Sequence, residues 1–238
     1  MLLENRIAFV TAAGAGIGRA GAIAMAAEGA MVIVTDLDPA RASDTADQIT
    51  AQGGRAEAAG LDVTDDKALT RAITETARRH GSLDVLHSHA GVQIPGRLDQ
   101  VTVDQMDASW QVNVRAHFVA AQAAMAVMKA QGAGSIIITA SNSGVQYDRV
   151  MIAYATTKHA VIAMTKQIAV AYARYIIRCN ALCPGFIDTR FNAGFVAQMG
   201  WRAALGTMSP VQSRWPASVP PMRSPTESCF SLRTALLS

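Results

Sequence analysis

A short apolar strand, a glycine-rich turn and a helix at the start of the chain constrain the fold more than any other feature. Residues 6–11 suit a buried strand, and the helix after the turn is rich in Ala and Met. Glycine lets the backbone approach a pyrophosphate, and a helix N-terminus offers free N–H groups and a positive dipole end. The same residues would also suit a tight strand-to-helix turn that binds nothing, so both interpretations stay open here.

Along the rest of the chain, short apolar segments alternate with longer segments of helical character. This alternation is typical of a doubly wound (Rossmann) α/β fold, in which helices cover both faces of a parallel sheet. We expect strands at residues 6–11, 31–35, 55–61, 83–86, 135–139 and 176–182. We expect helices up to residue 28, at 40–53, from 65, at 103–130 and at 151–176.

The composition of the 238 residues fits one such domain and excludes several classes of function. No apolar run reaches the roughly 18 residues of a membrane span, and the first residues do not resemble a secretory signal. A net charge of +3 without a Lys/Arg cluster gives no support for nucleic acid binding. Cys179, Cys183 and Cys229 form no C-x-x-C pair, so we expect free thiols in a reducing, cytoplasmic compartment. The first two of them alternate along the last strand and are expected in the core.

Acidic residues follow the second and third predicted strands. Asp36 lies about 20 residues beyond the glycine-rich turn, where a carboxylate accepts hydrogen bonds from adenosine ribose hydroxyls. It would repel a 2′-phosphate, and Leu37 adds no basic residue, so we expect NAD rather than NADP. The alternative is a helix N-cap role for Asp36, because Asp38-Pro39 begins the next helix. Asp62 likewise could cap the helix from residue 65.

A serine and a tyrosine–lysine pair follow the fifth predicted strand. Ser141 lies just past that strand, while Tyr154 and Lys158 are one helical turn apart and share a face of the next helix. Strand ends are where open α/β sheets bind ligands. The three side chains can therefore converge on one carbonyl group. Ser143 is the rival to Ser141, but its position before Gly144 fits less well.

The order of these motifs resembles that of the short-chain dehydrogenase/reductase family over roughly residues 5–208. Thr11, Gly16 and Gly18 match its glycine-rich pattern, whereas Ala12 replaces the first glycine and Gly14 is an additional one. The resemblance implies hydride transfer between a nicotinamide and an alcohol or ketone. The segments that would line the substrate pocket, around residues 93–95, 145–147 and 191–208, offer no charged clamp for an acid or phosphate, so we expect a small neutral or weakly polar alcohol.

The resemblance also implies roles for the residues. Tyr154 would be the general acid/base, its pKa of about 10 lowered by Lys158 and the cationic nicotinamide. Ser141 would donate a hydrogen bond to the substrate oxygen, and Lys158 would also hold the nicotinamide ribose. Asn113 would hold a water that links Lys158 to solvent, unless it is a polar residue satisfied within the sheet–helix interface. The implied cofactor contacts are Thr11, Gly14, Gly16, Ile17, Gly18, Asp36, Leu37, Asp62, Val63, Ala90, Gly91, Tyr154, Lys158, Pro184, Gly185, Ile187 and Thr189.

Two regions depart from the family pattern. Ser88 and His89 replace the two Asn of an Asn-Asn-Ala-Gly motif, which puts local rigidity and cofactor affinity in question. His87 and His89 form a His-x-His pair, but no partner cluster of metal ligands accompanies them, so we expect no metal. From about residue 209 prolines crowd the chain, and the expected helix and seventh strand are not recognisable. Shifting the reading frame of that tail permits family-like residues, so we predict a frameshift, an aberrant tail over 209–238 and a missing last strand.

These observations leave three functions open. The first is an NAD-dependent dehydrogenase or reductase of secondary alcohols and ketones. The second is an NADPH-dependent oxoacyl-thioester or carbonyl reductase, against which Asp36 and Leu37 argue. The third is an inactive nucleotide-binding or truncated member of the family. The resemblance implies a homo-oligomer, a dimer or tetramer, whose assembly and stability the aberrant tail would impair.

Overall fold

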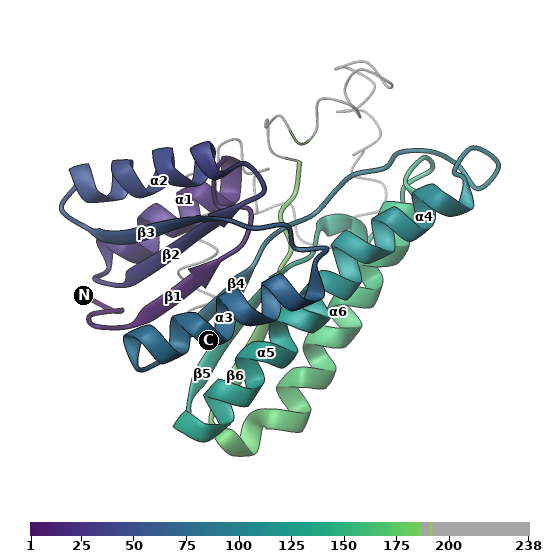
Figure 1. Cartoon of the computed structure of the whole chain (residues 1–238). Helices are drawn as coiled ribbons and strands as arrows, with labels where there is room; N and C mark the ends of the chain where they lie inside the picture. Colours follow the sequence, from purple (N-terminus) through teal and green to yellow (C-terminus); the bar gives the residue numbers. More distant parts are fainter. Residues whose placement is uncertain (187–190, 192–238) are drawn as a thin grey trace, which may run out of the picture.

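The computed structural model describes residues 1–186 and residue 191, and these form an α/β domain (Figure 1). Its six strands make one parallel sheet in the order β3-β2-β1-β4-β5-β6. The strands are β1 (Ile7–Val10), β2 (Met31–Asp36), β3 (Arg55–Gly60), β4 (Val85–Ser88), β5 (Gly134–Thr139) and β6 (Ile177–Leu182). The helices are α1 (Gly16–Ala27), α2 (Pro39–Ala51), α3 (Asp66–His80), α4 (Val103–Trp110), α5 (Ala116–Gln131) and α6 (Ile152–Tyr172).

Helices cover both faces of the sheet, as the alternating sequence predicted. Figure 1 shows α1 and α2 on one side of the sheet and α3, α5 and α6 on the other. Successive residues of a strand point to opposite faces, so Phe9 packs in the core below α3, α5 and α6, while Val10 packs in the core below α1 and α2. The doubly wound α/β fold is therefore confirmed. The tail at 209–238, with its expected frameshift and missing strand, lies outside the described residues.

Three predicted boundaries were wrong in ways that bear on the site. Strand β4 begins two residues later than expected, so His87 and Ser88 are inside the sheet with 0% and 2% of their surface exposed. The expected helix 103–130 is interrupted by a π-helical turn at Gln111–Arg115. Helix α6 ends at Tyr172, earlier than expected, and a 3₁₀ turn follows it.

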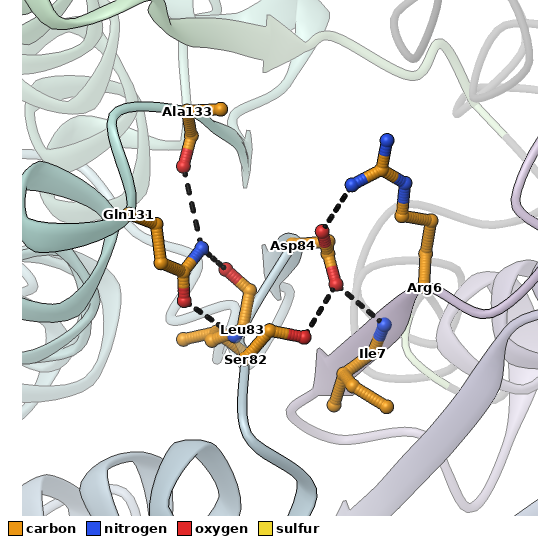
Figure 2. Close-up of polar contacts among 7 residues, drawn as sticks. All are labelled: Arg6, Ile7, Ser82, Leu83, Asp84, Gln131 and Ala133. Carbon is orange, nitrogen blue, oxygen red and sulfur yellow. Dashed lines mark hydrogen bonds and ion pairs between the residues drawn. The ribbon is translucent and has the colours of Figure 1, made fainter.

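The amino ends of β1 and β4 are joined by a polar cluster around Asp84 (Figure 2). Its carboxylate accepts hydrogen bonds from Arg6 Nη1 at 2.7 Å, from Ile7 N at 2.9 Å and from Ser82 Oγ at 2.9 Å. The Gln131 side chain at the end of α5 pairs with the backbone N–H and C=O of Leu83. These bonds fix β1 and β4 relative to each other at the sheet edge opposite the predicted site.

Strand order reverses between β1 and β4, because the chain runs outward to β3 before it returns to β4. In such sheets the crevice beyond the carboxyl ends of the two central strands is the usual place for a ligand. The glycine-rich turn, the Ala90-Gly91 loop, Ser141 and the Pro184-Gly185 turn each follow a strand at this edge. None of the helices in the described part of the chain combines the length and apolarity that crossing a bilayer requires.

Candidate active site

The glycine-rich turn connects β1 to α1 at the crevice. The N-cap residue of α1, Ala15, has no side chain that could cap the N–H groups of the first turn. These N–H groups are therefore available to an anion. Gly18 lies so close to its neighbours that a Cβ there would be 2.2 Å from the Ala12 carbonyl oxygen and 2.7 Å from His89 Cδ2. Only glycine fits at this position.

The two departures of this turn from the family pattern have different structural consequences. A Cβ on Gly14 would lie 2.8 Å from Asp36 Oδ2 and 2.6 Å from Arg41 Cβ, so the additional glycine is required by close packing. Ala12, which replaces the usual first glycine, has a φ of 51°. This left-handed conformation is strained for alanine.

Replacing Ala12 by glycine is expected to raise the free energy of unfolding by about 1 kcal/mol, because it removes the left-handed strain. Urea denaturation would measure the change. Ala13→Gly is the matched control, since Ala13 is buried with an ordinary φ and should lose stability on the same substitution. Lower stability of Ala12→Gly would show that the strain is absent.

Asp36 lies at the end of β2 and contacts the turn. Its Oδ2 accepts a hydrogen bond from Gly14 N at 2.9 Å and its Oδ1 accepts one from Asp38 N at 3.1 Å. The N-cap of α2 is Asp38, which accepts from Ala40 N, so the alternative that Asp36 caps this helix is wrong. Leu37, next to it, is 72% exposed.

Asp62 and Val63 follow β3. Asp62 Oδ1 accepts hydrogen bonds from Thr64 N at 2.8 Å and Thr64 Oγ1 at 2.7 Å, which holds the loop in a turn. The N-cap of α3 is Asp65, so Asp62 does not cap that helix either. Val63 packs against the larger hydrophobic core. The cofactor contact that the resemblance implies for Asp62 stays a prediction.

Thr11 joins the carboxyl ends of β1 and β4. Its hydroxyl oxygen accepts hydrogen bonds from His89 N at 2.8 Å and from Ala90 N at 3.1 Å. Ser88 Oγ pairs with His117 Nδ1 of α5 at 2.7 Å. The Ser88 and His89 replacements therefore keep this loop bonded to its surroundings, and the expected local loosening is not seen in these contacts.

Ser141 and Tyr154 face each other beyond β5. Ser141 is the N-cap of a 3₁₀ turn at Asn142–Gly144, and its Oγ donates a hydrogen bond to Asn142 Oδ1 at 3.0 Å. Ser141, unlike Ser143, also lowers the pKa of the Tyr154 phenol, so it lies beside that group. A Cβ on Gly144 would lie 2.7 Å from the Lys158 carbonyl oxygen, so glycine lets this turn pack directly on α6. Ser141 and Tyr154 are buried, with 7% and 5% of their surface exposed.

Lys158 extends from α6 into the same region. Its Nζ donates a hydrogen bond to the Thr139 carbonyl oxygen at 2.8 Å and lies 5.6 Å from the centre of the Tyr154 ring. A Cβ on Gly91 would be 3.5 Å from Lys158 Nζ and 3.2 Å from Asn113 Oδ1. The Ala90-Gly91 loop, the lysine and the asparagine therefore meet at one point.

Burial shifts the pKa values of Tyr154 and Lys158 in opposite directions. Burial raises the pKa of Tyr154 to about 12, and the hydrogen bond with Ser141 only partly opposes the rise. Burial also lowers the pKa of Lys158 to about 7, while the nearby Cys183 has a smaller, raising effect. Burial acts against the lowering of the tyrosine pKa that is expected from Lys158 and the cationic nicotinamide together, and that effect of a bound cofactor stays a prediction.

Asn113 sits in the π-helical turn and is fully buried. Its Nδ2 donates to Val92 O at 2.9 Å and approaches Ser109 Oγ and Thr157 Oγ1, both at 3.1 Å. Its Oδ1 accepts from Val92 N at 2.8 Å. The Asn113 amide thus joins three segments around Lys158, as expected for a polar residue that is satisfied within the sheet–helix interface. The water-holding role stays a prediction.

The segment after β6 lies next to the turn that follows Ser141. Asn142 N donates to Pro184 O at 3.0 Å, and no atom of the described residues lies within 4 Å of the position that a Cβ would take on Gly185. Ile187 and Thr189 lie outside the described residues. Cys179 is buried as expected, but the prediction of a core position for Cys183 is wrong: β6 ends at Leu182, and this thiol is exposed.

Sequence reasoning missed Thr139, His87 and Thr157 as parts of this region. Thr139 Oγ1 lies 3.0 Å from His87 Nε2 and 2.9 Å from His89 Nδ1. Thr157 Oγ1 donates to Tyr154 O at 2.7 Å within α6. Thr139 and His87 could have been found from the sequence, because each is a polar residue inside an otherwise apolar strand. Among residues 1–186 and 191, no three His, Cys, Asp or Glu side chains are grouped as metal ligands.

Comparison with known proteins agrees with this geometry. The short chain dehydrogenase family matches residues 6–200. The chain is 33% identical to the 2,3-dihydro-2,3-dihydroxybenzoate dehydrogenase of Bacillus subtilis (strain 168) over 187 residues, which are 79% of this chain and 72% of the relative. It is 38% identical to an A-factor type gamma-butyrolactone 1′-reductase (1S-forming) of Streptomyces virginiae over 203 residues, 83% and 77% of the two chains.

Among solved structures, the chain resembles a protein of Beutenbergia cavernae that is provisionally assigned as an NAD(P) dependent gluconate 5-dehydrogenase and has NADP bound at low occupancy. The TM-score is 0.86 at 31% identity, over 97% of this chain and 88% of that one. The chain therefore belongs to the short-chain dehydrogenase family. It is an NAD(P)-dependent oxidoreductase that acts on CH–OH groups.

Proposed function

We propose that this chain transfers a hydride between NAD(H) and a secondary alcohol or its ketone, with Tyr154 as the general acid/base. The observation that carries the proposal is the grouping of Ser141, Tyr154 and Lys158 beyond β5, on the same sheet edge as the glycine-rich turn. The free N–H groups of the first turn of α1 and the close approach at Gly18 fit a pyrophosphate. Bound there, the dinucleotide would accept or supply the hydride.

The residues of the chain would handle the proton. A buried phenol with a pKa of about 12 is protonated at neutral pH and can donate to a carbonyl oxygen, as reduction requires. In oxidation the phenolate must be favoured, and the ammonium form of Lys158 can do this because it is held beside the ring. Ser141 would donate a hydrogen bond to the same substrate oxygen and fix its position.

The surroundings of Tyr154 favour an uncharged substrate. The Phe191 ring centre lies 6.1 Å from that of Tyr154, and Phe186 packs against the same small cluster. Val145 and Tyr147, which follow the Ser141 turn, are exposed apolar side chains that a substrate could cover. None of these side chains offers a charge to a carboxylate or phosphate. We therefore propose a small neutral or weakly polar alcohol.

A panel of secondary alcohols with NAD, and of ketones with NADH, tests the proposal through the absorbance of NADH. NADP and NADPH are run in parallel. Turnover that depends on Tyr154 would support it. A chain that binds the dinucleotide but turns over none of the panel would instead be the inactive nucleotide-binding member.

NADP is a second candidate cofactor because of Arg41. Its Cβ lies against Gly14, its side chain is 52% exposed, and it pairs with Asp38 at 3.2 Å. A guanidinium there could reach a 2′-phosphate. Asp36 argues for NAD because its carboxylate bonds to Gly14 of the same turn, where it would repel a phosphate.

Replacing Asp36 by alanine or asparagine is expected to lower the preference for NAD over NADP by about tenfold, since a charge-assisted bond to the ribose is lost. Asparagine removes the charge but keeps an oxygen that can accept from Gly14 N–H. It therefore shows the effect of losing the charge while the turn keeps this hydrogen bond. The ratio of kcat/KM values for NAD and NADP measures the effect. An unchanged ratio in both variants would remove Asp36 from the cofactor site, and Arg41→Ala should weaken NADP alone.

We also propose that residues 1–208 make up the catalytic domain, that the protein acts as a homo-oligomer, and that residues 209–238 derive from a shifted reading frame. The proline-rich composition of this tail supports the last point. Sequencing the gene tests it: the idea fails if no small insertion or deletion near codons 209–214 restores a family-like frame.

A further inference from the structure

A single hydroxyl group lies between two histidine rings at the carboxyl ends of β4 and β5. Thr139 Oγ1 is 3.0 Å from His87 Nε2 and 2.9 Å from His89 Nδ1, and the two ring centres are 5.1 Å apart. Among the described residues Thr139 Oγ1 has no other partner. Burial keeps the pKa values of both histidines low, that of His89 at about 4, so both rings are neutral near pH 7.

The shared hydroxyl forces the two rings into opposite roles. A hydroxyl has one hydrogen to donate, and a neutral imidazole carries one N–H. The oxygen could accept from both rings, but the buried hydroxyl hydrogen would then be unpaired, because Thr139 Oγ1 has no other partner among the described residues. The Thr139 hydroxyl therefore donates to one ring and accepts from the other. Either His87 donates from Nε2 and His89 accepts at Nδ1, or the roles are reversed.

The unpaired nitrogen of His87 decides between these arrangements. His87 Nδ1 is buried and has no hydrogen-bond partner among the described residues. An unpaired buried N–H is rarer than an unpaired acceptor, so Nδ1 carries no hydrogen. His87 then donates from Nε2, the Thr139 hydroxyl donates to His89 Nδ1, and the hydrogen of His89 is on Nε2.

The Nε2 edge of His89 lies toward the glycine-rich turn. Its neighbour Cδ2 is the ring atom that a Cβ on Gly18 would meet at 2.7 Å. His87 Nδ1 and His117 Nε2 are buried, but His89 Nε2 is not among the buried unpaired atoms and no described residue pairs with it. This Nε2–H therefore has no partner among the described residues and lies near the uncapped first turn of α1, where a ligand could accept its hydrogen bond.

We propose that His89 binds the dinucleotide by donating its Nε2–H to a pyrophosphate oxygen, in a tautomer that Thr139 and His87 fix. This inference rests on the proposed function, since it adds a contact to the same cofactor site. The family pattern has asparagine at this position, and asparagine is too short to place a donor where Nε2 lies. The histidine therefore provides a contact that asparagine could not make, rather than merely filling the space beside Gly18.

Direct titration with NADH and with ADP-ribose at pH 7.5 tests the proposal in wild type and three variants of the full chain. His89→Gln places an amide N–H near the position of Nε2, His89→Asn preserves only the partner of Thr139, and His89→Phe preserves only the ring. We expect the Asn and Phe variants to bind both ligands about tenfold more weakly and the Gln variant to bind nearly as wild type. ADP-ribose contains the pyrophosphate but no nicotinamide, so equal losses place the contact away from the nicotinamide end.

Nitrogen-15 spectra of the histidine side chains supply a readout that packing alone would not change. We expect His89 to carry its hydrogen on Nε2 in wild type, to shift on NADH binding, and to lose its fixed tautomer in Thr139→Val. Melting temperatures identify any variant that fails to fold, and only folded variants are compared.

Several outcomes would overturn the inference. Folded His89→Phe could bind both ligands as tightly as wild type, or the Phe and Gln variants could lose the same affinity for them. The variants could also lose affinity for NADH but not for ADP-ribose, or the spectra could place the His89 hydrogen on Nδ1. If the wild-type protein binds neither NADH nor NADPH, the proposed function itself is refuted, independently of the variants.

Discussion

Replacing Tyr154 by phenylalanine is expected to lower kcat by about 10²- to 10⁴-fold, the usual contribution of a general acid/base. Phenylalanine keeps the ring that packs with Phe191 and Lys158 and removes only the hydroxyl that bonds with Ser141. NADH affinity should change little, because the predicted pyrophosphate site is formed by the glycine-rich turn. Steady-state kinetics and NADH titration on the same preparation measure the two effects separately.

Ser141→Ala is the companion variant for this prediction. It removes the hydrogen bond to the phenol and the proposed bond to the substrate oxygen, so turnover should fall while the tyrosine stays in place. Parallel loss of turnover and NADH affinity in Tyr154→Phe would indicate a misfolded site. Full turnover in that variant would refute the proposed mechanism.

Gly18→Ala should abolish measurable dinucleotide binding and lower the free energy of unfolding by about 1–3 kcal/mol. The added methyl group would meet the Ala12 backbone oxygen at 2.2 Å, and a backbone atom cannot move aside as a flexible side chain can. It would also press on His89 at 2.7 Å. The turn and the start of α1 must therefore shift apart. NADH titration and urea denaturation measure the two losses.

Gly81→Ala separates lost binding from lost stability. Gly81 ends α3 with a φ of 81°, and within the described part of the chain no atom lies within 4 Å of the position its Cβ would take. Alanine there should cost about 1 kcal/mol through backbone strain alone and leave NADH affinity unchanged. If Gly18→Ala behaves in the same way, the close approach at the turn has no part in binding.

Much of the fold and the candidate site could be predicted from local patterns. Glycines, short apolar strands and the Tyr154–Lys158 spacing are local features, and a parallel sheet necessarily brings the ends of its strands to one edge. The strand that contains His87 and Ser88 was misplaced because polar residues are usually exposed. Their partners, Thr139 and His117, come from distant parts of the chain.

Ionisation and hydrogen-bond direction required the tertiary structure. The spacing of Tyr154 and Lys158 indicated a charge effect on the phenol, but the depth of burial determines that its pKa is raised. The orientation of His89 likewise depends on a hydroxyl shared with His87 across two strands.

The sequence by itself determined the class of fold, the order of the motifs and the edge of the sheet where they gather, because periodicity and glycine content act over a few neighbouring residues. Only the tertiary structure decided which polar groups are paired, which stay charged and which nitrogen of His89 faces the glycine-rich turn. Those properties depend on desolvation and on partners far away in the chain, which no local pattern contains.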